Sequence, residues 1–235
     1  MKTEKLFSNP YDNPALAKVY EARYIHHHTQ QNDIKHEMSV INTIMTMNNY
    51  SSWCDVACGT AHHLRKTKGN FNRYGIDRSS TMINQHRDDT EYKVEYHIKN
   101  FLRWQSKKTF DLVTNFWFGY AHQPTLQKVL QFFDRLVEYT NVGGGVLISL
   151  HNQWKLFDTY PYVWNEPMGG KFIFDAMHWS YKEPETNDVY ECIVPHKDLI
   201  VERLSPYFTS YTYLDYPVYA GKELLYLQGK HDGLR

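Results

Sequence analysis

The sequence predicts an α/β fold whose centre is a doubly wound, mostly parallel sheet. Up to residue 150, short apolar segments with strand character alternate with segments of helical periodicity. This alternation is typical of parallel sheets, in which ligands bind at the carboxyl ends of the strands. The length of 235 residues and the hydrophobic content of 42% fit one globular domain.

The first predicted element is a helix that ends before residue 50, because apolar side chains recur there at the spacing of one helix face. These side chains are Ile34, Met38, Ile41 and Met45. We expect the first strand at 52–57. The small residues of 58–61 let the chain turn sharply before a helix that begins at His62.

The second predicted strand, 71–76, runs directly into Asp77. Ser79 or Ser80 can cap the helix that follows it. Two more strands are expected at 92–98 and 110–116. The second of these is short, β-branched and apolar enough to be buried on both faces.

The next helix carries four apolar residues at helical spacing, and Pro124 suits its first turn. The four residues are Leu126, Val129, Leu130 and Phe133. We expect the three glycines of 143–145 to end this helix and 146–150 to form the fifth strand.

From 151 to 190 the periodicity breaks down and aromatic residues dominate. We interpret this segment as an insertion that covers the site, with antiparallel strands near 171–181 and 189–195. A helix at 199–207 and a closing hairpin follow. The strands of the hairpin are 209–216 and 222–228, which makes a seven-stranded sheet with an antiparallel last strand.

We interpret residues 1–235 as a single domain with four parts. Residues 1–50 form an amino-terminal helical cap and 51–150 the ligand-binding core. Residues 151–198 form the inserted substrate flap, and 199–235 the closing helix and hairpin.

The charge balance excludes several classes of partner. Twenty-six basic and 26 acidic side chains cancel, and no basic stripe follows the chain, so we expect no nucleic acid partner. No apolar run approaches the roughly 20 residues of a membrane helix, so we expect no membrane partner either. The polar start predicts a cytoplasmic protein, and the neutral surface suits a small-molecule substrate.

The residues that carry chemistry lie where the first two strands end. The loop 55–61 has small residues at alternate positions, so a ligand can approach bare backbone there, and the following helix start offers unpaired N–H groups. Asp77 ends the second strand, 22 residues after Asp55, where an acidic residue accepts ribose hydroxyls in nucleoside-binding α/β sheets.

These motifs resemble those of the class I S-adenosylmethionine (SAM)-dependent methyltransferases. The similar segments are DVACGT (55–60), GIDRSSTMI (75–83), FDLVTNFWFGYAH (110–122) and GGGVLISL (143–150). The tyrosine segment AKVYEARY (17–24) and the final hairpin extend the resemblance over nearly the whole chain. The subgroup that we find most similar is the small-molecule N-methyltransferases of the amino-sugar and glycine type, whose fold is Rossmann-like.

The resemblance implies a site for SAM and its product S-adenosylhomocysteine (SAH). Asp55, Ala57 and Gly59 would line the methionine half and Asp77 would hold the ribose, while Tyr20 and Tyr24 would close over the sulfonium. The full set expected to bind the cofactor is Asp55, Ala57, Cys58, Gly59, Thr60, Asp77, Arg78, Met82, Asn100, Phe101, Asn115 and Phe116.

The chain departs from the family pattern in two motifs. Ala57 and Ala61 replace glycines that are frequent in the first motif, which adds a methyl group near the cofactor. The third motif usually supplies an Asp to the adenine, and here either His97 or Asn100 is left for that task.

Methyl transfer is an in-line displacement that needs alignment, water exclusion and no metal, and an amine acceptor must lose a proton. A neutral histidine near the acceptor would help, and we expect His122 and His151 to act in catalysis together with the two tyrosines. Aromatic faces can hold a sulfonium or an amine. The residues expected to contact the substrate are Trp117, Trp154, His178 and Trp179.

Other interpretations stay open at this stage. The acceptor atom could be oxygen instead of nitrogen, or the protein could bind SAM without transferring its methyl group. The aromatic segment after residue 151 could instead form the interface of a homodimer. Cys54 and Cys58 are expected to be buried small groups and not nucleophiles. Adjacent histidines at 26–28 and 62–63 point in different directions, which disfavours a metal site.

Overall fold

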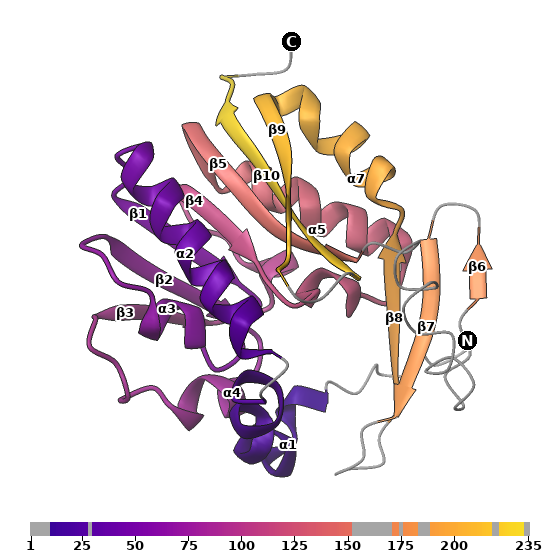
Figure 1. Cartoon of the computed structure of the whole chain (residues 1–235). Coiled ribbons are helices and arrows are strands. Elements are labelled where there is room, and N and C mark those ends of the chain that lie inside the picture. Colours follow the sequence, from indigo (N-terminus) through magenta and orange to yellow (C-terminus); the bar gives the residue numbers. More distant parts are fainter. Residues whose placement is uncertain are drawn as a thin grey trace.

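The computed structural model describes residues 10–27, 30–151, 171–173, 176–182, 189–217 and 221–232. A twisted central sheet has helices on both faces, and a small second sheet stands to one side of it (Figure 1). None of the helices in these ranges combines the length and the apolar character that a membrane crossing requires.

The central sheet has seven strands in the order β3-β2-β1-β4-β5-β10-β9. Their bounds are β1 Ser52–Val56, β2 Asn72–Asp77, β3 Val94–Ile98, β4 Phe110–Asn115, β5 Thr140–His151, β9 Phe208–Asp215 and β10 Lys222–Lys230. Strands β1 to β5 pair in parallel, and β10 is antiparallel to both of its neighbours. The predicted fold class is therefore confirmed, including the antiparallel last strand.

Six α-helices fall within the described residues. They are α1 Pro14–Tyr20, α2 Gln31–Met47, α3 His62–Lys66, α4 Ser80–Gln85, α5 Leu126–Glu138 and α7 Lys197–Leu204. A π-helical segment, η2 Glu21–Ile25, continues α1.

The strands are apolar on both faces, so each face of the sheet carries its own core. Leu112 and Leu147 belong to the core beneath α2, whereas their neighbours on the same strands, Val113 and Val146, belong to the core beneath α5 and α7. Side chains alternate between the faces of a strand, so two buried faces need the nearly continuous apolar runs that the sequence shows.

Helix α2 confirms the predicted apolar face and adds a feature that the apolar pattern did not predict. Ile34 and Ile41 are buried, and two acidic side chains of the same helix, Asp33 and Glu37, are fully buried with them. A buried charge is costly unless it is paired, so these positions need partners elsewhere in the fold.

The prediction that the three glycines end a helix is wrong. Helix α5 ends at Glu138, and the glycines lie inside β5. A Cβ on Gly144 would lie 2.6 Å from the carbonyl oxygen of Asp111, and one on Gly145 would lie 2.9 Å from that of Leu227. Glycine is needed here because neighbouring strands approach closely, and not to end a helix.

Smaller corrections concern the ends of elements. Thr125 caps α5, so Pro124 precedes the helix instead of forming its first turn. Helix α7 gives way at Ser205 to a 3₁₀ turn that runs to Tyr207. The single strand expected at 171–181 is a hairpin of two strands.

The three strands of the second sheet are β6 Lys171–Ile173, β7 Ala176–Lys182 and β8 Val189–Pro195, paired antiparallel in that order. The antiparallel flap is therefore present. The division of the chain into four parts stays a prediction.

Candidate active site

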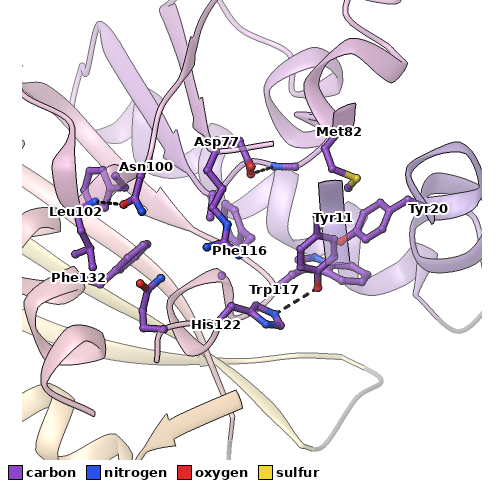
Figure 2. Close-up of a pocket in the computed structure, with 16 residues that line it drawn as sticks. Tyr11, Tyr20, Asp77, Met82, Asn100, Leu102, Phe116, Trp117, His122 and Phe132 are labelled. Carbon is purple, nitrogen blue, oxygen red and sulfur yellow. Dashed lines mark hydrogen bonds between the residues drawn. The ribbon is translucent and has the colours of Figure 1, made fainter. Parts of the chain in front are cut away.

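A pocket opens at the carboxyl ends of β1, β2 and β4, where the fold predicts a ligand. It holds about 760 Å³ of empty space including its mouth, which is within the 300–1,000 Å³ typical of small-molecule sites. The predicted site residues that line it are Tyr20, Ala57, Gly59, Asp77, Arg78, Met82, Asn100, Phe101, Phe116, Trp117 and His122. Figure 2 shows most of these side chains around one space.

Asp77 joins the two loops that form the floor of this pocket. One carboxylate oxygen accepts the N–H of Gly59 at 2.8 Å, and the other accepts the N–H of Ser79 at 2.8 Å (Figure 2 draws the first bond). Burial raises the pKa of Asp77, and these two hydrogen bonds offset part of the rise. Each oxygen keeps a second lone-pair direction, so the carboxylate can accept further donors from a ligand.

A smaller compartment of about 350 Å³ adjoins the pocket and shares with it Tyr20, Ala57, Gly59, Phe116 and Trp117. Its further lining residues are Ile25, Asp55, Cys58, Thr60, His62 and His63. The two spaces adjoin as one crevice, and the shared walls come from Tyr20 and from the loops after β1 and β4.

Asp55 is a buried carboxylate in the smaller compartment. The Thr114 hydroxyl donates to it at 2.6 Å. Burial raises the pKa of Asp55 to about 7, although the nearby His63 lowers it. A cation bound beside Asp55 would favour its ionised form.

The two alanines that replace family glycines have left-handed backbone conformations. Ala57 has φ +55° and Ala61 has φ +58°, values that glycine adopts without strain and alanine does not. The sequence predicted an extra methyl group at these positions, but backbone strain was not expected from it.

An amino-terminal cover made of Tyr11 and Tyr20 lies against one side of the pocket (Figure 2). Their rings meet edge to face at 6.0 Å. Tyr24 packs on Tyr20 at 5.0 Å but is not among the lining residues. The sequence analysis did not predict Tyr11 as a site residue. The one signal for it was its position close to the tyrosine segment 17–24.

On the opposite side, Asn100 lines the pocket and accepts the N–H of Leu102 at 3.0 Å, which caps a short 3₁₀ turn. His97 instead lies 3.0 Å from Glu95 and is not a lining residue. Of the two residues left open for the adenine, the structure brings only Asn100 to the pocket.

Asn115 lies behind the pocket wall. Its amide donates to the carbonyl of Val56 at 2.6 Å and accepts the N–H of Tyr120 at 3.2 Å, so it shapes the loop after β4.

Three histidines were predicted for the acceptor side, and the structure separates them. His122 lines the pocket, with the Tyr11 hydroxyl 3.3 Å from its Nε2 and the Cys192 sulfur 3.6 Å from its Nδ1. His151, at the end of β5, stacks on Phe118 at 3.4 Å and lines neither space. Burial lowers the pKa of His122 to about 4 and that of His151 to about 3, so both rings are neutral at pH 7.

Two of the remaining predicted residues belong to the second sheet. His178 is half-buried in β7, and the backbone of Trp179 belongs to the same strand. Trp154 lies outside the described residues.

Residues 54–140 match the family described as a methyltransferase domain. The sugar N-methyltransferase KedS8 from Streptoalloteichus sp. ATCC 53650 has a similar structure, with a TM-score of 0.66 and 14% identity over 99% of this chain and 98% of that one. The SAM-bound amino pentose methyltransferase CalS10 from Micromonospora echinaspora has a TM-score of 0.62 and 15% identity over 89% and 96%. DesVI from Streptomyces venezuelae has a TM-score of 0.64 and 18% identity over 90% and 97%.

The matched segment contains β1 to β4 and the whole floor of the pocket. This chain carries a SAM-dependent methyltransferase domain. SAM is the cofactor of that domain, and the resemblance inferred from the sequence motifs is confirmed. A search among curated proteins finds no match to the sequence.

The adjacent histidines and the cysteines were considered above as metal ligands and as nucleophiles. His62 and His63 face different carboxylates, Glu21 and Glu37. Within the described ranges, no three His, Cys, Asp or Glu side chains converge as metal ligands. Burial raises the pKa of the Cys58 thiol, which disfavours the nucleophilic thiolate.

Proposed function

We propose that this methyltransferase transfers the methyl group of SAM to a nitrogen atom of a small-molecule acceptor. When bound, SAM supplies a methyl group on a positively charged sulfur. The protein must then align donor and acceptor and exclude water. The observation that carries the choice of nitrogen is the state of His122 in the pocket wall.

His122 is half-buried in the pocket wall, and loss of solvation there lowers its pKa to about 4, so its ring is neutral at pH 7. Its ring therefore adds no positive charge beside a cationic donor. A base whose conjugate acid is so acidic is poor at removing a proton from a hydroxyl group in the transition state. A neutral amine can attack with its lone pair and release its proton afterwards, so the weak base suits nitrogen better than oxygen.

The donor's two ends fit the two parts of the crevice. Asp77 offers its remaining lone pairs to the ribose hydroxyls, and the adenine falls toward Met82 and Asn100. Asp55 and the backbone after β1 are available to the amino-acid end in the smaller compartment. The acidic group in each part supports this orientation.

The aromatic walls suit a cationic centre. The rings of Tyr20, Phe116 and Trp117 line both parts of the crevice. An aromatic face attracts a cation by about 0.5–2 kcal/mol, with the larger values at desolvated sites. Tyr11 and Tyr20 also cover the pocket and keep water from the reacting atoms.

The proposal is tested by matched acceptors that differ in one atom. The protein is incubated with SAM and with paired amino sugars and hydroxy sugars of the same ring, and methylated product is measured by mass spectrometry. We expect methylation of the amine in each productive pair, with at least about 100-fold less product from the hydroxyl partner.

Asp77→Ala is the control for donor binding, and it should abolish product formation. Methylation of only the hydroxyl partners would replace the proposal by O-methylation. A lack of product from any amine, in protein that binds SAH, would reject nitrogen transfer to these acceptors.

A further inference from the structure

The fully buried Glu37 of α2 lies behind the wall of the crevice. Its carboxylate accepts three hydrogen bonds from three different elements. His63 of α3 donates from Nε2 at 2.7 Å, and Trp117, after β4, donates from Nε1 at 3.2 Å. The hydroxyl of Tyr216, after β9, donates the third. One side chain therefore ties together segments that are far apart in the sequence.

Two of these three donors form the wall itself. Trp117 lines both parts of the crevice, and His63 lines the smaller part. The His63 ring also stacks on Phe116 at 4.6 Å with an angle of 17° between the planes, and Phe116 again lines both parts. The position of the shared wall thus depends on the carboxylate behind it.

The wall has a strained backbone that needs support. Trp117 has φ +56° and Phe118 has φ +59°, so two successive bulky residues adopt left-handed conformations. Such conformations persist only where the surroundings fix them, and they concentrate at functional sites. Here the Trp117 indole bonds to Glu37 on one side, and the ammonium of Lys222 lies 4.6 Å from its ring centroid.

The loop also packs directly against the loop after β1. A Cβ on Gly119 would lie 2.6 Å from the Cβ of Ala57, so only glycine fits at position 119. A shift of Trp117 would therefore be transmitted to residues on both sides of the crevice.

Basic and acidic groups surround Glu37 within the buried cluster. Burial raises the pKa of Glu37, but His63 and Lys222 outweigh that effect and hold it ionised. Burial lowers the pKa of His63, but Glu37, together with Asp55 and Glu21, outweighs burial and raises the pKa above its ordinary value. Asp33 is the second acidic group that faces Lys222.

We propose that Glu37 is a positioning residue, which holds Trp117 and His63 in the wall between the two donor compartments. Glu37 takes no part in bond making. The inference rests on the proposed methyl transfer, because it concerns the wall where the two ends of the donor meet.

The test compares Glu37→Gln with Asp111→Asn. Asp111 also accepts several hydrogen bonds, from Ser51, Ser52 and Asn141, but it lies at the amino end of the sheet. We expect Glu37→Gln to lower kcat at least about 10-fold, with a smaller change in the KM for the amine acceptor. Asp111→Asn should lower the melting temperature by a similar amount and leave kcat within about 2-fold.

A double-mutant cycle separates positioning from general stability. Trp117→Phe keeps an aromatic ring at this position and removes the indole N–H that donates to Glu37. If Glu37 acts through Trp117, the kcat loss of the double variant will be much smaller than the product of the two single losses. Fully multiplicative losses, or a wild-type kcat in folded Glu37→Gln, would overturn the inference.

A binding measurement keeps the inference testable without an acceptor. Trp117 fluorescence is obtained as the difference between the wild type and Trp117→Phe during titration with SAH. We expect the SAH-dependent change to be lost in Glu37→Gln and kept in Asp111→Asn. An unchanged signal in Glu37→Gln overturns the role of Glu37, whereas failure of the wild type to methylate any amine overturns only the proposed function.

Discussion

The two ends of the central sheet use the same kind of group in opposite ways. At the amino end, Asp111 accepts hydrogen bonds from Ser51, Ser52 and Asn141. Burial raises its pKa, but these bonds outweigh burial and hold the pKa below its ordinary value. At the carboxyl end, burial dominates instead and raises the pKa of Asp55 to about 7.

The backbone shows the same contrast. Among the described residues, five non-glycine positions have left-handed conformations, and four of them lie in the loops after β1 and β4. The four are Ala57, Ala61, Trp117 and Phe118. Strain and raised carboxyl pKa values are thus concentrated around the pocket, whereas the fifth position, Asn49, precedes β1 at the amino end and is of a residue type that tolerates this conformation. In the proposed function, one end of the sheet serves the reaction and the other serves stability.

The largest effect is expected from Asp77→Ala. The carboxylate holds the Gly59 and Ser79 backbone and, in the proposed function, the ribose. A hydrogen bond to a charged group contributes about 1.5–3 kcal/mol, so loss of the ribose bonds should weaken SAH binding about 100- to 1,000-fold. Isothermal titration calorimetry measures the change.

Asp111→Asn is the matched control for that prediction, because it alters a carboxylate of similar connectivity at the amino end. It should lower the free energy of unfolding by about 1–3 kcal/mol and leave SAH affinity within about 2-fold. If Asp111→Asn weakened SAH binding as strongly as Asp77→Ala, the division of labour between the two ends would be wrong.

The second largest effect is expected from His122→Ala. A neutral base that assists proton loss only weakly should contribute about 10- to 100-fold to kcat, below the 100- to 10,000-fold of strong general bases. His151→Ala should change kcat less, because His151 lies behind Phe118 and lines neither compartment. His231→Ala, beyond β10, is the control that should leave kcat unchanged. A larger loss in His151→Ala than in His122→Ala would exchange their roles.

Much of the carboxyl end could be predicted from the sequence, because its residues follow directly from strand ends. Asp55 and Asp77 terminate adjacent parallel strands, so strand order alone brings them together. Glu37 could not be predicted in this way. It lies on an apolar helix face, and its donors come from α3, the loop after β4 and the segment after β9. Such a cluster exists only after tertiary packing.

The histidines show the same limit from another side. His122 comes after β4 and His151 is the last residue of β5, so both were expected at the carboxyl edge and the sequence pattern did not favour either. Their difference comes from the neighbours, since Tyr11 reaches His122 whereas Phe118 covers His151. The prediction that the glycines of β5 end a helix was wrong for a related reason. Close approach of neighbouring strands cannot be inferred from the sequence of one strand alone.

The pH dependence of stability should also come from the carboxyl end. Burial lowers the pKa of His122 to about 4 and that of His151 to about 3, against about 6.5 in the unfolded chain. Below pH 6.5 the unfolded chain protonates these two histidines and the folded chain does not, so their contribution to stability falls as the pH falls. Asp55, whose pKa burial raises to about 7, takes up its proton in the folded chain over the same range and contributes in the opposite direction. Between pH 7 and 5.5 the loss should be about 1 kcal/mol for each histidine.

Urea unfolding at several pH values measures this slope, and His151→Gln should make it shallower. His63 works in the opposite direction, because its pKa is raised. Its contribution is complete below pH 6.5 and is lost as the pH rises through its folded-state pKa. Asp111, whose pKa is lowered, contributes above its ordinary value of 3.8 and weakens only below it. An unchanged slope in His151→Gln would show that His151 takes up a proton in the folded protein.

The smallest effect is expected from Ala57→Gly, which tests whether strain at the carboxyl end is tolerated for its function. A left-handed alanine costs about 1–2 kcal/mol of stability, which glycine would relieve. Glycine also raises the entropy of the unfolded chain, which offsets about 0.4–1 kcal/mol of that gain. The variant should therefore be more stable by at most about 1 kcal/mol, which raises the melting temperature by about 2–4 °C. Ala15→Gly, in the exposed face of helix α1, is the matched change at an unstrained position and should destabilise the protein instead.

If Ala57→Gly also leaves SAH affinity within about 3-fold, the methyl group of Ala57 is tolerated and not required for binding. A large loss of affinity would show that its contact with the donor outweighs the strain.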